Sequence, residues 1–115
     1  MENIETINIG TIKTWNIEEM TGYKPITTFY TDFSIADGFG VDAIKDTYKR
    51  AFEEWKSDYK YLTELVMVLN WKIAEHYESN MEYAKVYNDL WAKADAYACE
   101  HLKGAELDYF YSTTD

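Results

Sequence analysis

Two Glu-His pairs are the residues of this sequence best suited to chemistry. Glu75-His76 and Glu100-His101 each place an imidazole beside a carboxylate, a combination used for metal ligation and general base catalysis. Both pairs fall near the C-terminal ends of expected antiparallel helices, which separates them by about 30 Å, the length of a 20-residue helix. The spacing matches neither the Glu-x-x-His motif of di-iron bundles nor the His-Glu-x-x-His motif of zinc proteases. We interpret both histidines as structural, because a cationic side chain near a helix C-terminus is favourable by itself.

A lone cysteine and two closely spaced glycines are weaker chemical candidates. Cys99 lies two residues before a histidine, and helical positions i and i+2 do not face each other. Gly38 and Gly40 resemble a phosphate-binding turn, but Asp37 and Asp42 flank them and no lysine follows at the P-loop position. We interpret the cysteine as a helix-packing residue and the glycines as helix ends. The sequence therefore indicates no catalytic residue, no metal ligand and no cofactor site, and predicts a protein that is not an enzyme.

The composition indicates one acidic domain. The chain has 115 residues, 47% of them apolar, and a formal net charge of −10. This length suits a single core. Nucleic acid and anionic membrane are poor partners because both are bound by Lys/Arg-rich surfaces. A basic protein surface is the natural partner by charge complementarity, unless the acidity serves only solubility.

Localisation follows from three absences in the sequence. The single cysteine gives no disulfide framework, which suits a reducing cytoplasm. The N-terminal residues lack the basic and apolar regions of a secretion signal. The longest apolar run, at 65–69, is far too short to span a bilayer. We therefore expect a soluble cytoplasmic protein.

The elements are expected to surround one apolar segment, Tyr61–Tyr77. Three helices are predicted, at about 41–56, 59–78 and 79–102, because apolar residues recur there at three- and four-residue spacing. Ser57-Asp58 is expected to cap the second helix, and Ser79 with Glu82 has the form of a capping box for the third. Short connections make the three helices antiparallel neighbours with the second in the middle. The predicted fold class is mainly α, an antiparallel three-helix bundle.

The two ends of the chain are predicted to be less regular. Residues 1–25 form an N-terminal arm, extended or with short strands, because isoleucine and threonine abound without a helical period. Residues 26–115 form the single helical domain. Within it, residues 26–40 begin extended and then form one helical turn capped by Thr31 or Asp32. Gly104 is expected to cap the third helix, and the residues after it to form one short C-terminal helical turn.

The aromatic residues supply the candidate interface. The chain contains 4 Trp, 11 Tyr and 5 Phe, more than a small core obviously needs. The simpler interpretation is a Tyr/Trp-rich core; the alternative is that some of them anchor a partner, since Tyr and Trp are enriched in binding hot spots. Together with acidic residues that could surround them, the candidate interface residues are Trp71, Tyr61, Tyr83, Tyr109, Tyr111, Glu18, Glu19, Asp37 and Asp42.

Three segments carry a resemblance to a family. The stretches 27–37, 61–77 and 102–115 resemble small acidic proteins of phages and of integrated or conjugative elements of gut and oral bacteria. The resemblance spans about residues 27–115, leaves the arm outside, and brings no functional residues with it. It implies a mobile genetic element, where small acidic proteins are often accessory factors, including inhibitors of host nucleases and CRISPR complexes.

Three functions follow from these observations, in order of preference. The first is a non-enzymatic accessory factor that binds a basic host protein, a nuclease or nucleic-acid-binding complex. It would act as an anti-CRISPR or anti-restriction protein by DNA mimicry, with carboxylates in place of phosphates. The second is a structural or regulatory homo-oligomer in which the arm pairs across subunits. The third is a small metal-dependent enzyme with a carboxylate–histidine site.

Overall fold

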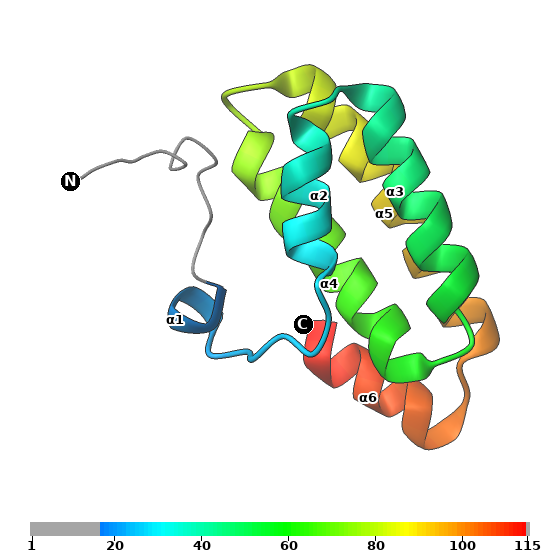
Figure 1. Ribbon diagram of the computed structural model, residues 1–115. Coiled ribbons are helices and arrows are strands. Elements are labelled where there is room, and N and C mark those ends of the chain that lie inside the picture. Colours follow the sequence, from blue (N-terminus) through cyan, green and yellow to red (C-terminus); the bar gives the residue numbers. More distant parts are fainter. Residues whose placement is uncertain (1–16, 115) are drawn as a thin grey trace.

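The computed structural model describes residues 17–114, and this part of the chain is helical (Figure 1). The helices are α1 (Ile17–Thr21), α2 (Phe29–Asp37), α3 (Val41–Trp55), α4 (Tyr59–His76), α5 (Met81–His101) and α6 (Gly104–Thr114). The three long helices agree with the predicted positions within two residues at each end. A mainly helical fold is thus confirmed for the described residues.

Helix α4 is the centre of the fold, as its sequence predicts. It packs against α2, α3, α5 and α6, and every side chain from Leu62 to Leu69 is buried. The Asp58 side chain accepts hydrogen bonds from the backbone N–H groups of Lys60 (3.1 Å) and Tyr61 (3.3 Å), so the predicted cap is confirmed. A helix that is apolar around most of its circumference needs neighbours on several sides, and α4 has four.

The chain between the arm and α3 differs from its prediction. Residues 29–37 form a nine-residue helix, α2, rather than a single turn capped by Thr31 or Asp32. Phe29 and Phe33 of this helix are buried in the core, which supplies the packing energy that local propensity lacks. Figure 1 shows α2 lying alongside α3, with the tight turn between them at one end of the bundle. The result is an additional layer over α4.

The C-terminal segment is also more helical than predicted. An 11-residue helix, α6, packs against α4 and α5 through the buried Phe110, where one short turn was expected. Gly104 does not cap α5; it has φ of +58° and begins α6, while Leu102 ends α5 in an extended conformation. The third-helix capping box is also wrong, because Asn80 is the N-cap and accepts from the Tyr83 N–H at 3.1 Å.

The described part of the N-terminal arm is tied to the bundle by a buried carboxylate. Glu64 of α4 is fully buried and accepts hydrogen bonds from the Tyr23 hydroxyl and the Ile26 and Thr27 N–H groups, each at 2.8 Å. The Thr27 hydroxyl donates to the same carboxylate. Residues 17–21 are helical rather than extended or stranded. The rest of the predicted arm, 1–16, lies outside the described residues.

Candidate functional site

Three of the candidate interface aromatics are engaged within the molecule. Tyr61 stacks on Trp55 with ring centroids 4.3 Å apart. Tyr109 packs edge-on against the Tyr59 ring at 5.3 Å. Tyr83 donates its hydroxyl to the backbone carbonyl of Asp37 at 3.0 Å. All three are half-buried, so each packs within the molecule and only part of its side chain is open to a partner.

The four candidate acidic residues divide into two groups. Glu18, Glu19 and Asp42 are exposed, as a charged interface requires. The Asp37 side chain is only 16% exposed and lies in a network of internal charges. Asp37 is therefore placed as an internal partner of other side chains rather than as an open surface charge.

A buried lysine is the centre of that network. The Lys72 side chain is 0% exposed, and its Nζ lies 2.7 Å from Asp37 Oδ2 and 2.9 Å from Glu75 Oε2. It also donates to Ser34 Oγ at 3.1 Å and lies 5.0 Å from the centroid of the Tyr30 ring. A buried ammonium is stable only when its donors are satisfied and its charge is paired, and Lys72 meets both conditions.

Histidine and tyrosine complete the network around Asp37. His76 Nε2 lies 2.9 Å from Asp37 Oδ2, the Tyr87 hydroxyl donates to Asp37 Oδ1, and the two rings stack at 5.7 Å. Burial alone would raise the pKa of the Asp37 carboxyl, but hydrogen bonds from His76, Lys72 and Tyr87 outweigh it and hold the pKa below its usual value. Burial, and then the hydrogen bond to Asp37, raises the pKa of Tyr87.

The same network has the donor set of a metal site. One ligand atom from each of Asp37, Glu75 and His76 lies within 4.8 Å of the others, and carboxylate with imidazole suits zinc or iron. Lys72 Nζ, however, already bonds both carboxylates and supplies the positive charge that a metal ion would bring. The arrangement is therefore that of an ion-pair network in which one buried lysine faces two carboxylates, and it fits the structural interpretation of His76.

Sequence reasoning did not find this network, although one signal was present. Lys72 continues the buried stripe of Leu65 and Leu69 at three-residue spacing, and a lysine on an apolar face needs a partner. The partner Asp37 comes from α2, which was not predicted as a full helix. The second Glu-His pair is not part of the network; His101 is exposed and stacks on Tyr97 at 3.9 Å.

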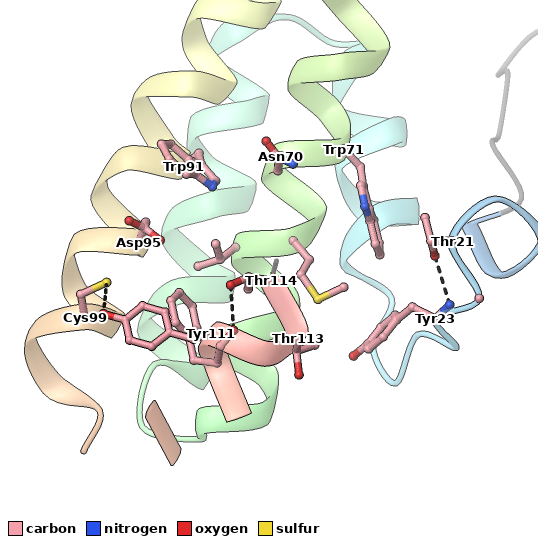
Figure 2. A pocket seen from close by; sticks show the side chains of 14 residues that line it. Thr21, Tyr23, Asn70, Trp71, Trp91, Asp95, Cys99, Tyr111, Thr113 and Thr114 are labelled. Carbon is pink, nitrogen blue, oxygen red and sulfur yellow. Dashed lines mark hydrogen bonds between the residues drawn. The ribbon is translucent and has the colours of Figure 1, made fainter. Parts of the chain in front are cut away.

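The two remaining candidate aromatics, Trp71 and Tyr111, line the same groove (Figure 2). The groove has a volume of about 710 Å³ and runs between α4, α5, the end of α6 and the segment after α1. Figure 2 shows Trp91, Asp95, Cys99 and Tyr111 on one side of it and Trp71 with Tyr23 on the other. The residues that line it are Thr21, Gly22, Tyr23, Val66, Met67, Asn70, Trp71, Trp91, Asp95, Cys99, Phe110, Tyr111, Thr113 and Thr114.

Of the described residues that line this groove, Asp95 is the one that carries a charge. No hydrogen bond or ion pair joins Asp95 to any side chain in the part of the chain that the structure describes, and partial burial raises the pKa of its carboxyl. Cys99 is exposed, and the Tyr111 hydroxyl lies 3.8 Å from its Sγ. The groove thus combines aromatic walls with one unpaired carboxylate.

A second hollow lies between α2 and α3. Its volume is about 520 Å³, and Asp32, Asp46 and Glu54 line it together with Arg50. Phe39, in the turn between the two helices, also lines it and is 80% exposed. Acidic groups therefore border an exposed apolar side chain here as well.

Comparison with known proteins does not add to this geometry. Searches against protein-family models, curated proteins and solved structures each give no match to this chain. The resemblance to small acidic proteins of phages and mobile elements therefore stays a prediction, as does the cytoplasmic location. Among the helices between residues 17 and 114, none is both long and apolar enough to cross a membrane.

Proposed function

We propose that this chain is a non-enzymatic acidic protein that binds a basic surface of another protein. The observation that carries the proposal is the uncompensated negative charge of its surface. The net charge is −10, and most described carboxylates are exposed. A surface of this kind attracts and orients a positively charged partner.

The ion pairs show why this charge is available. Lys72 is buried and forms ion pairs with Asp37 and Glu75, so its positive charge does not offset the negative charge of the surface. On the surface, Asp42, Asp46 and Glu54 form no ion pair within the described residues. Carboxylates that form no ion pair keep their attraction for a cation on a partner.

The partner class follows from the kind of protein that carries a large basic surface. Proteins that handle nucleic acids do so because their surfaces neutralise phosphates. We propose such a protein as the partner, with carboxylates of this chain in place of the phosphates. In the mobile-element setting that the resemblance implies, the partner would be a host nuclease or CRISPR complex, and binding would inhibit it.

The test is capture of host proteins on the immobilised full-length chain at two salt concentrations. We expect nucleic-acid-binding proteins to be retained at about 0.1 M salt and released near 1 M, where the Debye length falls from about 10 Å to about 3 Å. Duplex DNA added to the lysate should compete with the chain for the same proteins. Retention that ignores both salt and DNA would refute charge mimicry.

A charge-neutralised variant makes the test specific. Asp42→Asn, Asp46→Asn and Glu54→Gln together should weaken capture, because they remove exposed charge without touching the core. Replacing the exposed Lys45, Lys49 and Lys85 by Gln is the matched control and should not weaken it. Equal loss in both variants would show that the number of substitutions matters rather than their charge.

The homo-oligomer alternative is separated by a different measurement. It was predicted from an arm that pairs across subunits, and residues 1–16 of that arm lie outside the described part. Light scattering of the full chain distinguishes the two functions. A monomer removes the homo-oligomer, whereas a stable dimer that captures no basic protein favours it.

A further inference from the structure

The α5–α6 side of the larger groove presents a carboxylate, a helix C-terminus and aromatic rings, each of which attracts a cation. Trp91, Asp95 and Cys99 follow one another at four-residue spacing along α5, so they lie on one face of that helix. Figure 2 shows the Tyr111 ring of α6 facing them. Because α5 and α6 are packed against the same central helix, this arrangement is held by the fold rather than by a loop.

The charges on this side of the groove are negative. Among the described residues that line the groove there is no lysine, arginine or histidine, and Asp95 carries their one formal charge. The groove also includes Thr113 and Thr114, the last described residues of the 11-residue helix α6. A helix C-terminus carries partial negative charge, so it adds to the field of the carboxylate.

The aromatic rings add a third attraction. Trp91 is half-buried and Tyr111 is 47% exposed, so part of each ring is open to a ligand. The face of an indole or phenol ring attracts a cation through its quadrupole, most strongly for tryptophan. Partial desolvation of the Asp95 carboxylate leaves it less stabilised by water, and a paired cation would restore that stabilisation.

We propose that this groove binds an arginine side chain of the partner protein, with the guanidinium against Trp91 and hydrogen-bonded to Asp95. Arginine suits the groove better than lysine because its planar guanidinium stacks on aromatic faces and forms two parallel hydrogen bonds to one carboxylate. The assignment rests on the proposed function, since it names the group of the basic partner that this face recognises. Tyr111, a predicted interface residue, faces this site, and Trp71, another, lines the opposite side of the same groove.

The test uses N-acetyl-arginine amide as the probe and the indole N–H signals of the full-length chain in NMR as the readout. We expect the Trp91 signal to shift in a saturable way with weak affinity. The Trp55 signal should not shift, because that ring stacks on Tyr61 outside the groove. N-acetyl-glutamine amide, which is neutral, should leave both signals unchanged.

Two variants separate the carboxylate from the rest of the helix. Asp95→Asn should lower the affinity for N-acetyl-arginine amide by about fivefold or more, because it removes one partly buried ion pair. Asp89→Asn changes the same charge on the same helix at an exposed position outside the groove, and should not weaken it. Equal affinity in Asp95→Asn and the native chain would overturn the proposal.

Other outcomes also overturn it and identify the occupant. Equal or tighter binding of N-acetyl-lysine amide would refute the arginine preference. If the probe does not bind but salt-sensitive capture of basic proteins persists, the groove proposal fails and the proposed function stands. If the probe binds but no basic protein is captured, the proposed function fails instead.

Discussion

At the scale of single residues, the most informative one is Lys72. It is fully buried on the mostly apolar helix α4, and two carboxylates, one from α2 and one from α4, neutralise it. A buried ion pair is not a strong source of stability, but removing one partner leaves the others uncompensated. The network therefore fixes how α2 sits on α4 more than it adds to the total stability.

Replacing Lys72 with Met should destabilise the protein strongly. We expect a loss of about 3 kcal/mol or more in the free energy of unfolding, because Asp37 and Glu75 would keep their charges without the cation. Urea denaturation at neutral pH measures it. Lys85→Met, at an exposed position on α5, is the matched control and should change stability by less than about 0.5 kcal/mol.

A triple variant tests the reason for that loss. Combining Lys72→Met with Asp37→Asn and Glu75→Gln removes the stranded charges, so part of the lost stability should return. If the triple variant is less stable than Lys72→Met alone, the hydrogen bonds of the carboxylates matter more than their charge.

At the scale of elements, the segment before α2 is attached through one side chain. Glu64 of α4 receives hydrogen bonds from Tyr23, Ile26 and Thr27, so a carboxylate buried in the bundle holds a stretch that has no regular structure of its own. The same stretch carries Tyr23 into the wall of the larger groove. The shape of the groove therefore depends on this attachment.

Substituting Glu64 with Gln should release the segment while leaving the bundle folded. The amide NH₂ of glutamine would face N–H donors that now find an oxygen, at a cost of about 2 kcal/mol. Hydrogen exchange should accelerate at the Ile26 and Thr27 amides and remain slow in the middle of α4. Glu78→Gln, an exposed change just after α4, is the control and should leave both rates unaltered. Unchanged exchange in Glu64→Gln would contradict the anchoring role.

At the scale of the whole molecule, the buried tyrosines make stability depend on alkaline pH. Burial, and then the charge of Glu53, raises the pKa of Tyr48 to about 12, and burial is also the main cause of the raised pKa values of Tyr23 and Tyr87. These hydroxyls stay protonated in the folded state after they would ionise in the unfolded chain. Their contribution is thus complete below about pH 10 and is lost as pH rises through the folded pKa values.

A tyrosine titration checks this dependence. In the folded protein, Tyr23, Tyr48 and Tyr87 should ionise only above the usual tyrosine pKa of about 10 or together with unfolding. Phenolate absorbance and circular dichroism followed together across pH 9 to 13 measure both events. In guanidinium the titration should be a single step near pH 10. A single step in the folded protein would contradict the burial of these hydroxyls.

The sequence predicts the long helices because their signals are local. Apolar residues recur along α3, α4 and α5 with the helical period, and Asp58 caps α4 from the adjacent position. It fails at α2, where Thr28, Thr31 and aromatic residues favour extended backbone by local propensity. Burial of Phe29 and Phe33 against other helices overrides that preference. Tertiary contacts of this kind cannot be predicted from a short stretch of sequence.

For the candidate site, too, the sequence shows the local pattern, and tertiary packing decides which residues come together. The four-residue spacing that places Trp91, Asp95 and Cys99 on one helix face is visible in the sequence, but the groove that this face lines is not. Tyr111 becomes a wall of the groove because α6 is a full helix that ends there. Asp37 becomes an internal partner because α2 carries it to Lys72.

The sequence by itself determined the acidic charge, the helical class and the central place of α4, because charge adds residue by residue and helical periodicity is a local property. The tertiary structure decided which charges are neutralised inside and which are free to act. Asp37 and Glu75 are paired with Lys72, while Asp95 faces a groove in which no described residue supplies a counter-charge. The physical reason is that pairing and desolvation depend on distances between helices far apart along the chain, which only packing sets.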